Sequence, residues 1–172
     1  MSPPVFGITG WKNSGKTTLT CKLVQEFTRR GFRVATLKHA HHLFDVDHEG
    51  TDSYRHREAG AGEVAIVSGR RWAIMHELDG ADEPSLEEML ARLSPCDLVL
   101  IEGYKRESHP KIEARRLAAS DREPLAGADA SICAIAADHA ITDAQVPVFP
   151  LDDIAGIADM IAHKTGLGET AA

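Results

Sequence analysis

One stretch constrains the fold of this chain more than any other: residues 10–17, Gly-Trp-Lys-Asn-Ser-Gly-Lys-Thr, match the pattern G-x-x-x-x-G-K-[S/T]. A short β-rich run, residues 5–9, precedes the pattern, and helical spacing follows it, with Leu19, Leu23 and Phe27 at four-residue intervals. The glycines let the backbone curl so that successive N–H groups point at a phosphate, adding to the positive end of the following helix. The sequence therefore predicts a phosphate-binding loop between a strand and a helix.

The positions of this loop have separate expected roles. Lys16 would neutralise the β- and γ-phosphate oxygens of a nucleotide, the hydroxyl of Thr17 would coordinate Mg²⁺, and Thr18 is placed to donate toward the α-phosphate. We therefore assign nucleotide contacts to the whole run: Gly10, Trp11, Lys12, Asn13, Ser14, Gly15, Lys16, Thr17 and Thr18.

A magnesium–nucleotide site also needs a carboxylate near Thr17, and the aliphatic run at residues 97–102, Asp-Leu-Val-Leu-Ile-Glu, offers two. At about 3.3 Å per residue, Asp97 and Glu102 lie about 16 Å apart, at opposite ends of one strand. Ligands of open α/β sheets bind at the carboxyl ends of the strands. Glu102 is therefore the predicted metal ligand with Thr17, and the predicted catalytic residue with Lys16, whereas Asp97 is predicted to be a surface cap.

The remaining pattern favours an α/β protein of the P-loop NTPase type, with three layers and a mostly parallel sheet flanked by helices. Further strands are predicted over residues 32–38, 131–136 and 146–151, and a β-hairpin is added by residues 63–68 and 72–78. Ser85 and Glu88 form a capping box that predicts a helix, whereas residues 105–130 are charged and punctuated by Gly and Pro. The 172-residue length predicts one nucleotide-binding domain over residues 1–165, with a flexible tail at 166–172.

Charge and composition exclude several classes of partner. With 19 Lys and Arg against 26 Asp and Glu, the net charge of -7 opposes binding to nucleic acid or to an anionic membrane. No apolar run approaches the ~20 residues of a membrane helix. Three scattered cysteines indicate reduced thiols. We therefore expect a cytoplasmic protein without nucleic-acid or membrane partners.

The base of the nucleotide is not read by the familiar N-K-x-D motif, because Asn13 is the only asparagine in the chain. Asp138 follows the predicted strand at residues 131–137, and its carboxylate would accept from both the ring N–H and the exocyclic amine of guanine. The alternative for Asp138 is that it forms a turn, as aspartates after strands commonly do.

A second polar segment is dense in histidine, with five histidines interleaved with acidic residues: His39, His41, His42, His48 and His56. One interpretation is a transition-metal site, since residues 39 and 41 share a face of an extended chain. A second is a mouth for an anionic second ligand beside the nucleotide, formed by the histidines with Lys38, Arg55 and Arg57. A solvated loop or a subunit contact is the third, and none of the histidines receives an individual role.

Four segments together resemble the molybdopterin-guanine dinucleotide biosynthesis protein B (MobB) family: G-W-K-N-S-G-K-T-T-L, the run L-K-H-A-H-H-L-F-D-V-D-H-E-G-T-D-S-Y-R-H-R-E-A-G-A, D-L-V-L-I-E-G-Y-K and H-P-K-I-E-A-R-R. The similarity extends from Val5 to about Ile161. The resemblance implies a homodimeric, cytoplasmic GTP-binding protein with weak GTPase activity and Mg²⁺ as cofactor. It implies an accessory role to the guanylyltransferase that joins GMP to molybdopterin, and contacts to nucleotide or cofactor from residues 45–57, among them Asp52.

Two other functions stay open on the sequence. In a small-molecule phosphotransferase, a carboxylate such as Glu102 or Asp52 would activate a substrate hydroxyl. In a GTP-driven metal-insertion protein, the histidine segment would carry the metal. For the dimer, the apolar hairpin at residues 64–78, with Trp72 and Met75, is the expected contact. In some dimeric ATPases a lysine stands at the position that Trp11 occupies in this loop. Here the lysine, Lys12, comes one place later, so we do not assign Lys12 a role in the site of the other subunit.

Overall fold

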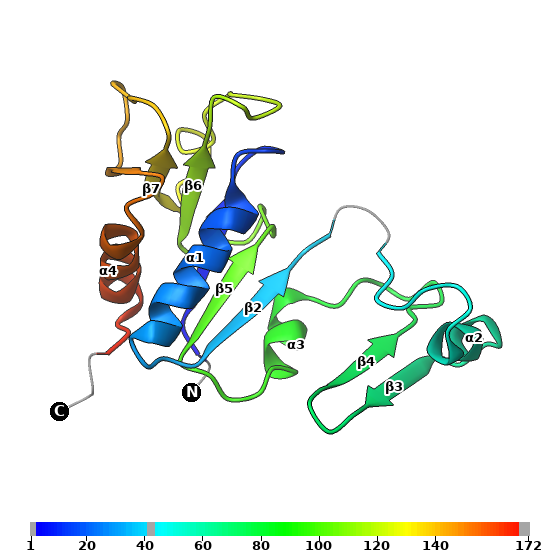
Figure 1. Ribbon diagram of the computed structural model, residues 1–172. Helices are drawn as coiled ribbons and strands as arrows, with labels where there is room; N and C mark the ends of the chain where they lie inside the picture. Colours follow the sequence, from blue (N-terminus) through cyan, green and yellow to red (C-terminus); the bar gives the residue numbers. More distant parts are fainter. Residues whose placement is uncertain (1–2, 41–43, 169–172) are drawn as a thin grey trace. The chain divides into compact units, whose positions relative to one another are not determined.

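The computed structural model describes residues 3–40 and 44–168 (Figure 1). They form two compact units, the first comprising Met1–His39 with Leu90–Ala172 and the second Ala40–Met89. The expected single domain over residues 1–165 stays a prediction, and each unit is considered by itself below.

The first unit is built on a six-stranded sheet in the order β2-β5-β1-β6-β7-β8, with every neighbouring pair parallel. The strands are β1 Val5–Thr9, β2 Val34–Lys38, β5 Leu98–Glu102, β6 Lys111–Arg115, β7 Ile132–Ala137 and β8 Val148–Pro150. The predicted parallel sheet is confirmed, and all five residues of β5 are buried, as its aliphatic run indicates. Strand β1 lies between β5 and β6, so the phosphate loop leaves the centre of the sheet.

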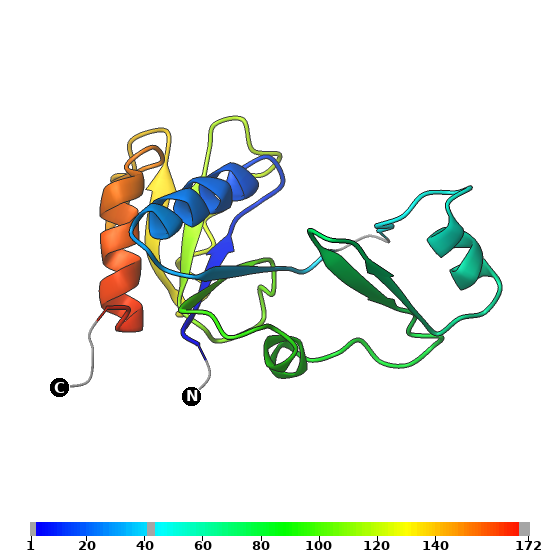
Figure 2. The same ribbon diagram turned by 60° about the horizontal axis from the view of Figure 1, so that its bottom comes forward.

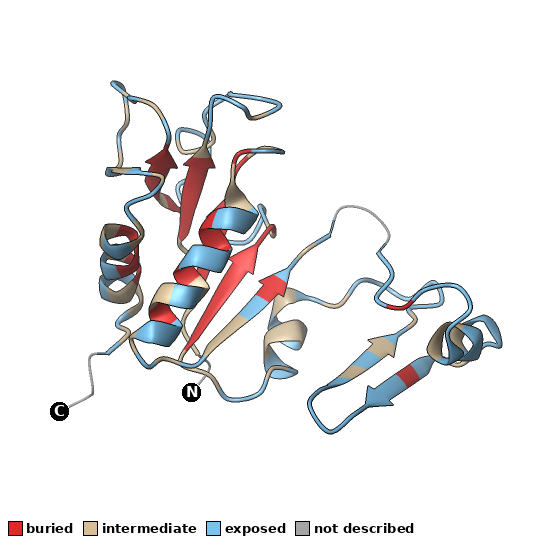
Figure 3. Ribbon diagram, viewed as in Figure 1, coloured by how far each residue is buried: buried red, intermediate tan, exposed pale blue. Residues whose placement is uncertain are grey.

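Two helices, α1 Lys16–Arg29 and α4 Ile154–Thr165, pack together on one face of this sheet (Figures 1 and 2). Side chains of α1 at four-residue spacing enter the core, and alternate residues of the strands meet them because strand side chains alternate between faces. The red segments in Figure 3 mark this buried layer. Its members include Leu19, Leu23, Phe27, Phe6, Ile8, Leu100, Ile112, Ile157 and Ile161.

The helix α4 ends in a defined cap. Gly166 adopts φ 66°, and the N–H of Leu167 donates to the carbonyl of Ala162 over 2.9 Å. Residues 166–168 of the predicted flexible tail are therefore described as helix cap, whereas residues 169–172 lie outside the described part of the chain.

On the opposite face of the sheet, buried charged groups of β6 bind irregular segments of the chain. Lys111 is fully buried, and its ammonium donates to the carbonyl of Glu107 and the hydroxyl of Ser131. Glu113 is 1% exposed and accepts hydrogen bonds from the N–H groups of residues 125 and 126. These partners satisfy charges that would otherwise be costly to bury.

Strand β6 lies in a region, residues 105–130, to which the sequence analysis assigned no strand. In β6 the charged residues Lys111, Glu113 and Arg115 alternate with the apolar Ile112 and Ala114. The apolar residues face the helices, and the charged ones face the irregular segments that supply their partners. The sequence analysis missed this strand because it considered the charges by composition and not by alternation.

The second unit contains the helix α2 Asp52–Glu58 and the antiparallel hairpin of β3 Glu63–Val67 and β4 Trp72–His76. The hairpin was predicted at this place and is confirmed. One of its faces carries Ala65, Val67, Trp72 and Ile74, of which Val67 and Trp72 are 76% and 67% exposed. Val64 and Met75 lie on the other face, where Val64 is buried and Met75 half-buried.

A three-acid cluster around one arginine stabilises the second unit. The Arg57 guanidinium pairs with Asp47, Asp45 and Glu77 at 2.6, 3.1 and 3.1 Å. Hydrogen bonding to Asp47 is the main cause that raises the pKa of Arg57. The Arg57 side chain is therefore held by structural ion pairs within the second unit.

The helix α3 Leu86–Ala91 follows the hairpin and starts with the predicted capping box. The carboxylate of Glu88 accepts from the N–H of Ser85 over 2.8 Å, and the N–H of Glu88 donates to the Ser85 hydroxyl over 3.2 Å. Among the described residues, no helix combines the length and the apolar character needed to cross a membrane.

Candidate nucleotide site

The phosphate loop takes its shape from residues that adopt positive φ. Gly10 has φ 140° and Gly15 φ 92°, and a Cβ at Gly10 would lie 2.5 Å from the carbonyl oxygen of Ala114. Gly15 is the N-cap of α1 and provides no side-chain cap hydrogen bond. The first amides of α1 are thus available for an anion, with the helix dipole behind them.

Lys16 lies across the loop. Its ammonium donates to the carbonyl of Trp11 over 2.7 Å, which holds the side chain over the loop that would receive the phosphates. Burial lowers the pKa of Lys16 below its ordinary value, and the nearby Glu102 carboxylate opposes that effect. The Glu102 carboxylate therefore lies near Lys16, at the position expected for a magnesium ligand.

Thr17 and Glu102 come together at the start of α1. The Thr17 hydroxyl donates to Glu102, with its oxygen 3.0 Å from Oε1 and 3.1 Å from Oε2. Glu102 lies at the carboxyl end of β5, on the face that the helices cover, and the Lys38 ammonium is 3.6 Å from Oε1. A hydroxyl and a carboxylate are hard oxygen donors of the kind Mg²⁺ binds, so the residues present fit that ion.

Asp97 occupies the opposite end of β5, as its position in the sequence suggests. It forms an ion pair of 2.8 Å with Arg33 and accepts the N–H of Arg33 over 2.7 Å. The hydrogen bond from the Arg33 side chain is the main cause that lowers the pKa of Asp97 to about 2. The carboxylate thus joins the start of β2 to the start of β5, away from the phosphate loop.

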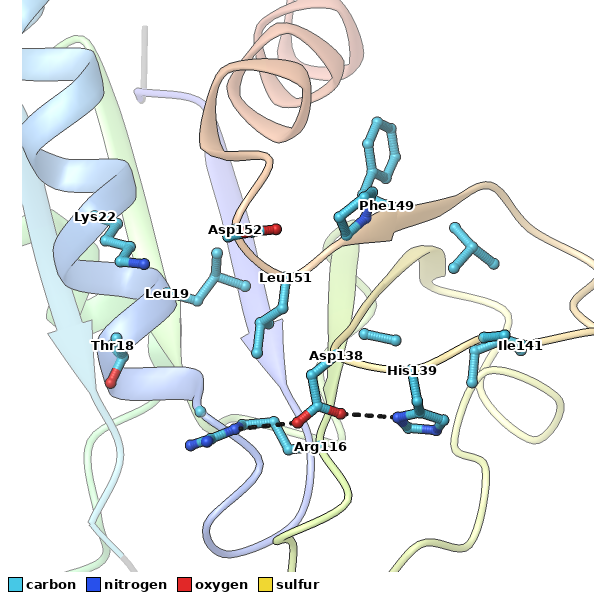
Figure 4. Close-up of a pocket in the computed structure, with 15 residues that line it drawn as sticks. Thr18, Leu19, Lys22, Arg116, Asp138, His139, Ile141, Phe149, Leu151 and Asp152 are labelled. Atoms are coloured by element: carbon cyan, nitrogen blue, oxygen red, sulfur yellow. Dashed lines mark hydrogen bonds and ion pairs between the residues drawn. The ribbon is translucent and has the colours of Figure 1, made fainter.

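A cavity of about 860 Å³ opens beside the phosphate loop (Figure 4). Gly15, Thr18 and Lys22 line it from α1, while further lining residues follow the carboxyl ends of β6, β7 and β8. Its volume falls in the range of small-molecule and cofactor sites. The cavity is therefore large enough for the base and ribose of a nucleotide whose phosphates lie on the loop.

Asp138 forms part of the wall of this cavity, directly after β7. Its Oδ1 accepts from the N–H of Leu117 over 3.0 Å and lies 2.9 Å from Nδ1 of His139, and its Oδ2 is 3.5 Å from Nε of Arg116. In Figure 4 the carboxylate lies between the Arg116 and His139 side chains. The hydrogen bond with His139 is the main cause that lowers the pKa of Asp138, which favours the ionised carboxylate.

Several lining residues were missed by the sequence analysis, and the main ones are Lys22, Arg116, His139 and Asp152. Arg116 follows directly after β6, and its side chain packs against Gly15, where a Cβ would lie 2.9 Å from the Arg116 Cδ. The available signal was the run Lys-Ile-Glu-Ala-Arg-Arg. If this run had been recognised as a strand, Arg116 would have been placed at the carboxyl edge of the sheet, where ligands bind.

Residues 116–126, here called the bracing segment, hold the outer side of the phosphate loop. The N–H and hydroxyl of Ser120 both donate to the carbonyl of Lys12, over 2.9 and 3.1 Å. The indole N–H of Trp11 donates to the carbonyl of Glu123 over 2.8 Å, and the Lys105 ammonium lies 4.7 Å from the centre of the Trp11 ring. The hydrogen bonds from Ser120 and to Glu123 cross more than a hundred residues of sequence, so nothing local indicated them.

The histidine segment is divided between the two units. His39 follows β2, and its N–H donates to the carbonyl of Glu102 over 2.9 Å. The second unit contains His48, His56 and Asp52. Asp52 is exposed in the first turn of α2. The other two histidines, His41 and His42, lie outside the described residues. Within residues 3–40 and 44–168, no group of three or more His, Cys, Asp or Glu is arranged to hold a metal ion.

The strand order, the glycine-shaped loop at the start of α1 and the acid at the end of the neighbouring strand together define a protein with the P-loop NTPase type of fold. The family model "MobB: Molybdopterin guanine dinucleotide synthesis protein B" matches residues 5–138, and the chain belongs to this family.

Two curated relatives carry the name molybdopterin-guanine dinucleotide biosynthesis adapter protein. The relative from Escherichia coli is 36% identical over 162 residues, which cover 93% of this chain and 92% of the relative. The relative from Haemophilus influenzae is 39% identical over 163 residues, covering 93% and 88%.

Solved structures show the same fold. The crystal structure of Bacillus subtilis MobB aligns with a TM-score of 0.74 at 26% identity, covering 94% of this chain and 98% of that one. The MobB homologue from Bacillus stearothermophilus aligns with a TM-score of 0.69 at 28% identity, covering 94% and 97%. The predicted family and the P-loop NTPase type of fold are thereby confirmed.

Proposed function

We propose that the protein is a GTP-binding adapter of molybdenum cofactor biosynthesis, which assists the guanylyltransferase that attaches GMP to molybdopterin. The observation that carries the nucleotide part is the pairing of Thr17 with Glu102 at the start of α1, beside the phosphate loop. The names of the curated relatives support the adapter part.

In this proposal the phosphates lie on residues 10–18. The backbone N–H groups of the loop donate to the phosphate oxygens, Lys16 leaves the Trp11 carbonyl to neutralise them, and Thr18 is placed near the α-phosphate. Mg²⁺, held by Thr17 and Glu102, would supply charge neutralisation between the phosphates. Each of these groups would act through its position and its charge.

We also propose that hydrolysis of GTP is slow, and the same geometry supports this. A fast GTPase needs a group that orients the attacking water and a cation that neutralises the charge of the transition state. Glu102 is paired with the Thr17 hydroxyl and lies near Lys38, so its carboxylate is better placed to hold the metal ion than to take a proton. We therefore propose a weak GTPase in which binding is the main function.

For the base we propose the cavity beside Asp138. The carboxylate stands at the carboxyl end of β7, where it faces a ligand that extends from the phosphate loop. An ionised carboxylate accepts from the two adjacent donors of guanine, a pair that adenine lacks. His139 and the N–H of Leu117 fix the orientation of Asp138, so the preference for guanine would depend on this one side chain.

We propose three partners: the guanylyltransferase, molybdopterin and a second copy of this chain in the cytoplasm. The exposed apolar face of the hairpin, with Val67, Trp72 and Ile74, supports the dimer, because monomers rarely expose a contiguous apolar face of this kind. Met75 is not part of that face. Asp52 and the other residues 45–57 are proposed to contact nucleotide or cofactor from the second unit.

A thermal-shift panel tests the proposal. GTP, GDP and ATP are added with and without Mg²⁺, and each condition is repeated with the guanylyltransferase present. We expect GTP with Mg²⁺ to raise the melting temperature most, and the transferase to increase that shift, because a ligand that binds only the folded state stabilises it. Equal shifts for GTP and ATP would remove the assigned base preference, and no shift with any nucleotide would remove the proposed function.

A further inference from the structure

A second, smaller cavity lies on the other side of the phosphate loop, between that loop and the bracing segment. Its volume is about 200 Å³, and Trp11 and Ser14 line it from the phosphate loop. Residues of β6 and of the bracing segment complete it, and it shares Arg116, His139 and Ile141 with the wall of the nucleotide cavity. Figure 4 labels these three residues in the nucleotide cavity. The volume is below that of a nucleotide site but sufficient for a small group.

Two buried hydrogen-bonding groups of this cavity lack partners. Ser14 is 1% exposed, and its hydroxyl has no hydrogen-bond partner among residues 3–40 and 44–168. The Nε of Arg115 is likewise buried without a partner in that part of the chain. Both groups can donate, and an unmade buried hydrogen bond is costly. The pair therefore indicates that an acceptor enters the cavity.

The alternation of β6 turns the adjacent side chains of Arg115 and Arg116 in different directions. Arg115 shares a face with Glu113, opposite the helices, whereas Arg116 turns to the side of α1 and packs against Gly15. Glu113 is already neutralised, because it accepts from the N–H groups of residues 125 and 126 and from the Arg115 Nη2 over 2.8 Å. The Arg115 Nε thus remains for a ligand while its Nη2 is fixed by Glu113.

Both unpartnered groups are donors, so the ligand that they would bind must present acceptor atoms. Arg116, Arg122 and His139 also line the cavity, as do the acids Asp121 and Glu123, and of these five only His139 is not exposed. Arginine forks match the oxygens of phosphate groups. We propose that this cavity binds the phosphate monoester of a second ligand, at the same time as a nucleotide occupies the phosphate loop.

Occupation of this cavity would also affect the nucleotide. Ser14 belongs to the phosphate loop, and Trp11 joins that loop to the bracing segment through its hydrogen bond to Glu123. A ligand that contacts both sides would stabilise the loop in the form that binds phosphates. Coupling between two sites is reciprocal, so a nucleotide would raise the affinity for the monoester by the same factor.

The test uses the fluorescence of Trp11. The chain has two tryptophans, so the Trp72→Phe variant leaves Trp11 as the only one. This protein is saturated with Mg²⁺ and a non-hydrolysable GTP analogue, whose binding is measured first and separately. Glycerol 3-phosphate is then titrated in, with glycerol plus NaCl at matched ionic strength as the blank and inorganic phosphate as a second arm. We expect a saturable change with glycerol 3-phosphate and tighter binding than for inorganic phosphate.

Two variants connect the signal to the cavity. Arg115→Lys keeps the charge beside Glu113 but removes the Nε donor, and Arg122→Gln removes an exposed charge at the rim. Each is expected to weaken the monoester about tenfold, the typical effect of losing one hydrogen bond to a charged group. Arg92→Gln, at an exposed arginine outside the cavity, is the matched control and should change nothing.

The outcomes separate this inference from the proposed function. Failure of the GTP analogue to bind removes the proposed function, and the titration without nucleotide then still tests the cavity. No saturable signal, or equal affinity in the variants and the control, overturns the second site. Tighter binding of inorganic phosphate than of the ester overturns the monoester assignment. If Arg115→Lys no longer binds the GTP analogue, Arg122→Gln decides the result, because its side chain is exposed.

Discussion

The hydroxyl of Thr17 lies within hydrogen-bonding distance of both oxygens of Glu102, 85 residues further along the chain. This contact joins the first turn of α1 to the end of β5 and forms the magnesium-binding part of the proposed site. Glu102→Gln should therefore weaken binding of GTP with Mg²⁺ about tenfold or more, because the amide is a poorer ligand, and should change binding in EDTA little. Calorimetry in both buffers measures this difference.

Asp97→Asn is the control for that experiment. It changes an acid of the same strand whose partner is Arg33, at the opposite end of β5. Its nucleotide affinity should equal that of the unmodified protein. Loss of affinity in both variants to the same degree would show that the strand, and not the carboxylate at residue 102, matters for Mg²⁺.

Lys16→Ala should weaken nucleotide binding about a hundredfold without unfolding the protein. The lysine is partly buried over the loop, and its removal costs a charge-assisted contact to the phosphates, roughly 3 kcal/mol or a factor of about a hundred in affinity. Circular dichroism checks the fold and calorimetry checks binding, with the exposed Lys164→Ala in α4 as the matched control. Unchanged affinity for GTP in folded Lys16→Ala protein would contradict the phosphate site.

Asp138→Asn tests how the base is recognised. The amide oxygen can still accept the N–H of Leu117, whereas the NH₂ group replaces an acceptor by a donor. We expect affinity for GTP to fall about tenfold or more and affinity for xanthosine triphosphate to rise, since xanthine has an oxygen where guanine has its amine. Competition binding with GTP, ATP and xanthosine triphosphate measures the change; an unaltered ratio of GTP to ATP affinity would exclude the assigned role.

Trp72→Glu should dissociate the proposed dimer. The side chain is exposed on the apolar face of the hairpin, where a carboxylate would remain unpaired in a contact between copies. Sedimentation should show a dimer for the unmodified protein and a monomer for the variant. Arg70→Glu, in the turn of the same hairpin, controls for the added charge. A monomer for the unmodified protein would remove the dimer proposal.

His109 should make the stability depend on pH between about 4 and 6.5. Burial, and the nearby Lys111 ammonium, lower the pKa of this half-buried ring to about 4, whereas Asp129 opposes the shift. The unfolded chain binds the proton first, at about pH 6.5, so the free energy of unfolding falls as the pH drops through this window, by about 1–2 kcal/mol. His109→Gln should show a shallower dependence in urea melts at pH 4.5 and 7. Parallel curves would contradict it.

The sequence predicted the parts of the fold whose residues interact with near neighbours. The phosphate loop has a fixed local pattern, the four aliphatic residues of β5 indicate a buried strand, and the capping box of α3 needs only Ser85 and Glu88. Glu102 followed from the rule that ligands bind at the carboxyl ends of parallel strands.

The parts that escaped prediction depend on partners far along the chain. Lys111 is tolerable in a strand interior only because Glu107, Ser131 and Asp129 satisfy its ammonium. The bracing segment has no regular pattern, and its function becomes visible only in the hydrogen bonds of Ser120 and Glu123 to the phosphate loop. The assignment of Asp52 stays a prediction, because that residue belongs to the second unit.

The central position of β1 has a consequence for biosynthesis. Its two neighbours in the sheet, β5 and β6, follow it by some ninety and more than a hundred residues, and the contacts of the bracing segment come later still. On the ribosome the amino-terminal strand, loop and helix therefore emerge well before the segments that complete their surroundings. In the proposed function, the nucleotide site would be complete only after the carboxyl-terminal half has been translated, so truncated products should be unable to compete for the pool of GTP.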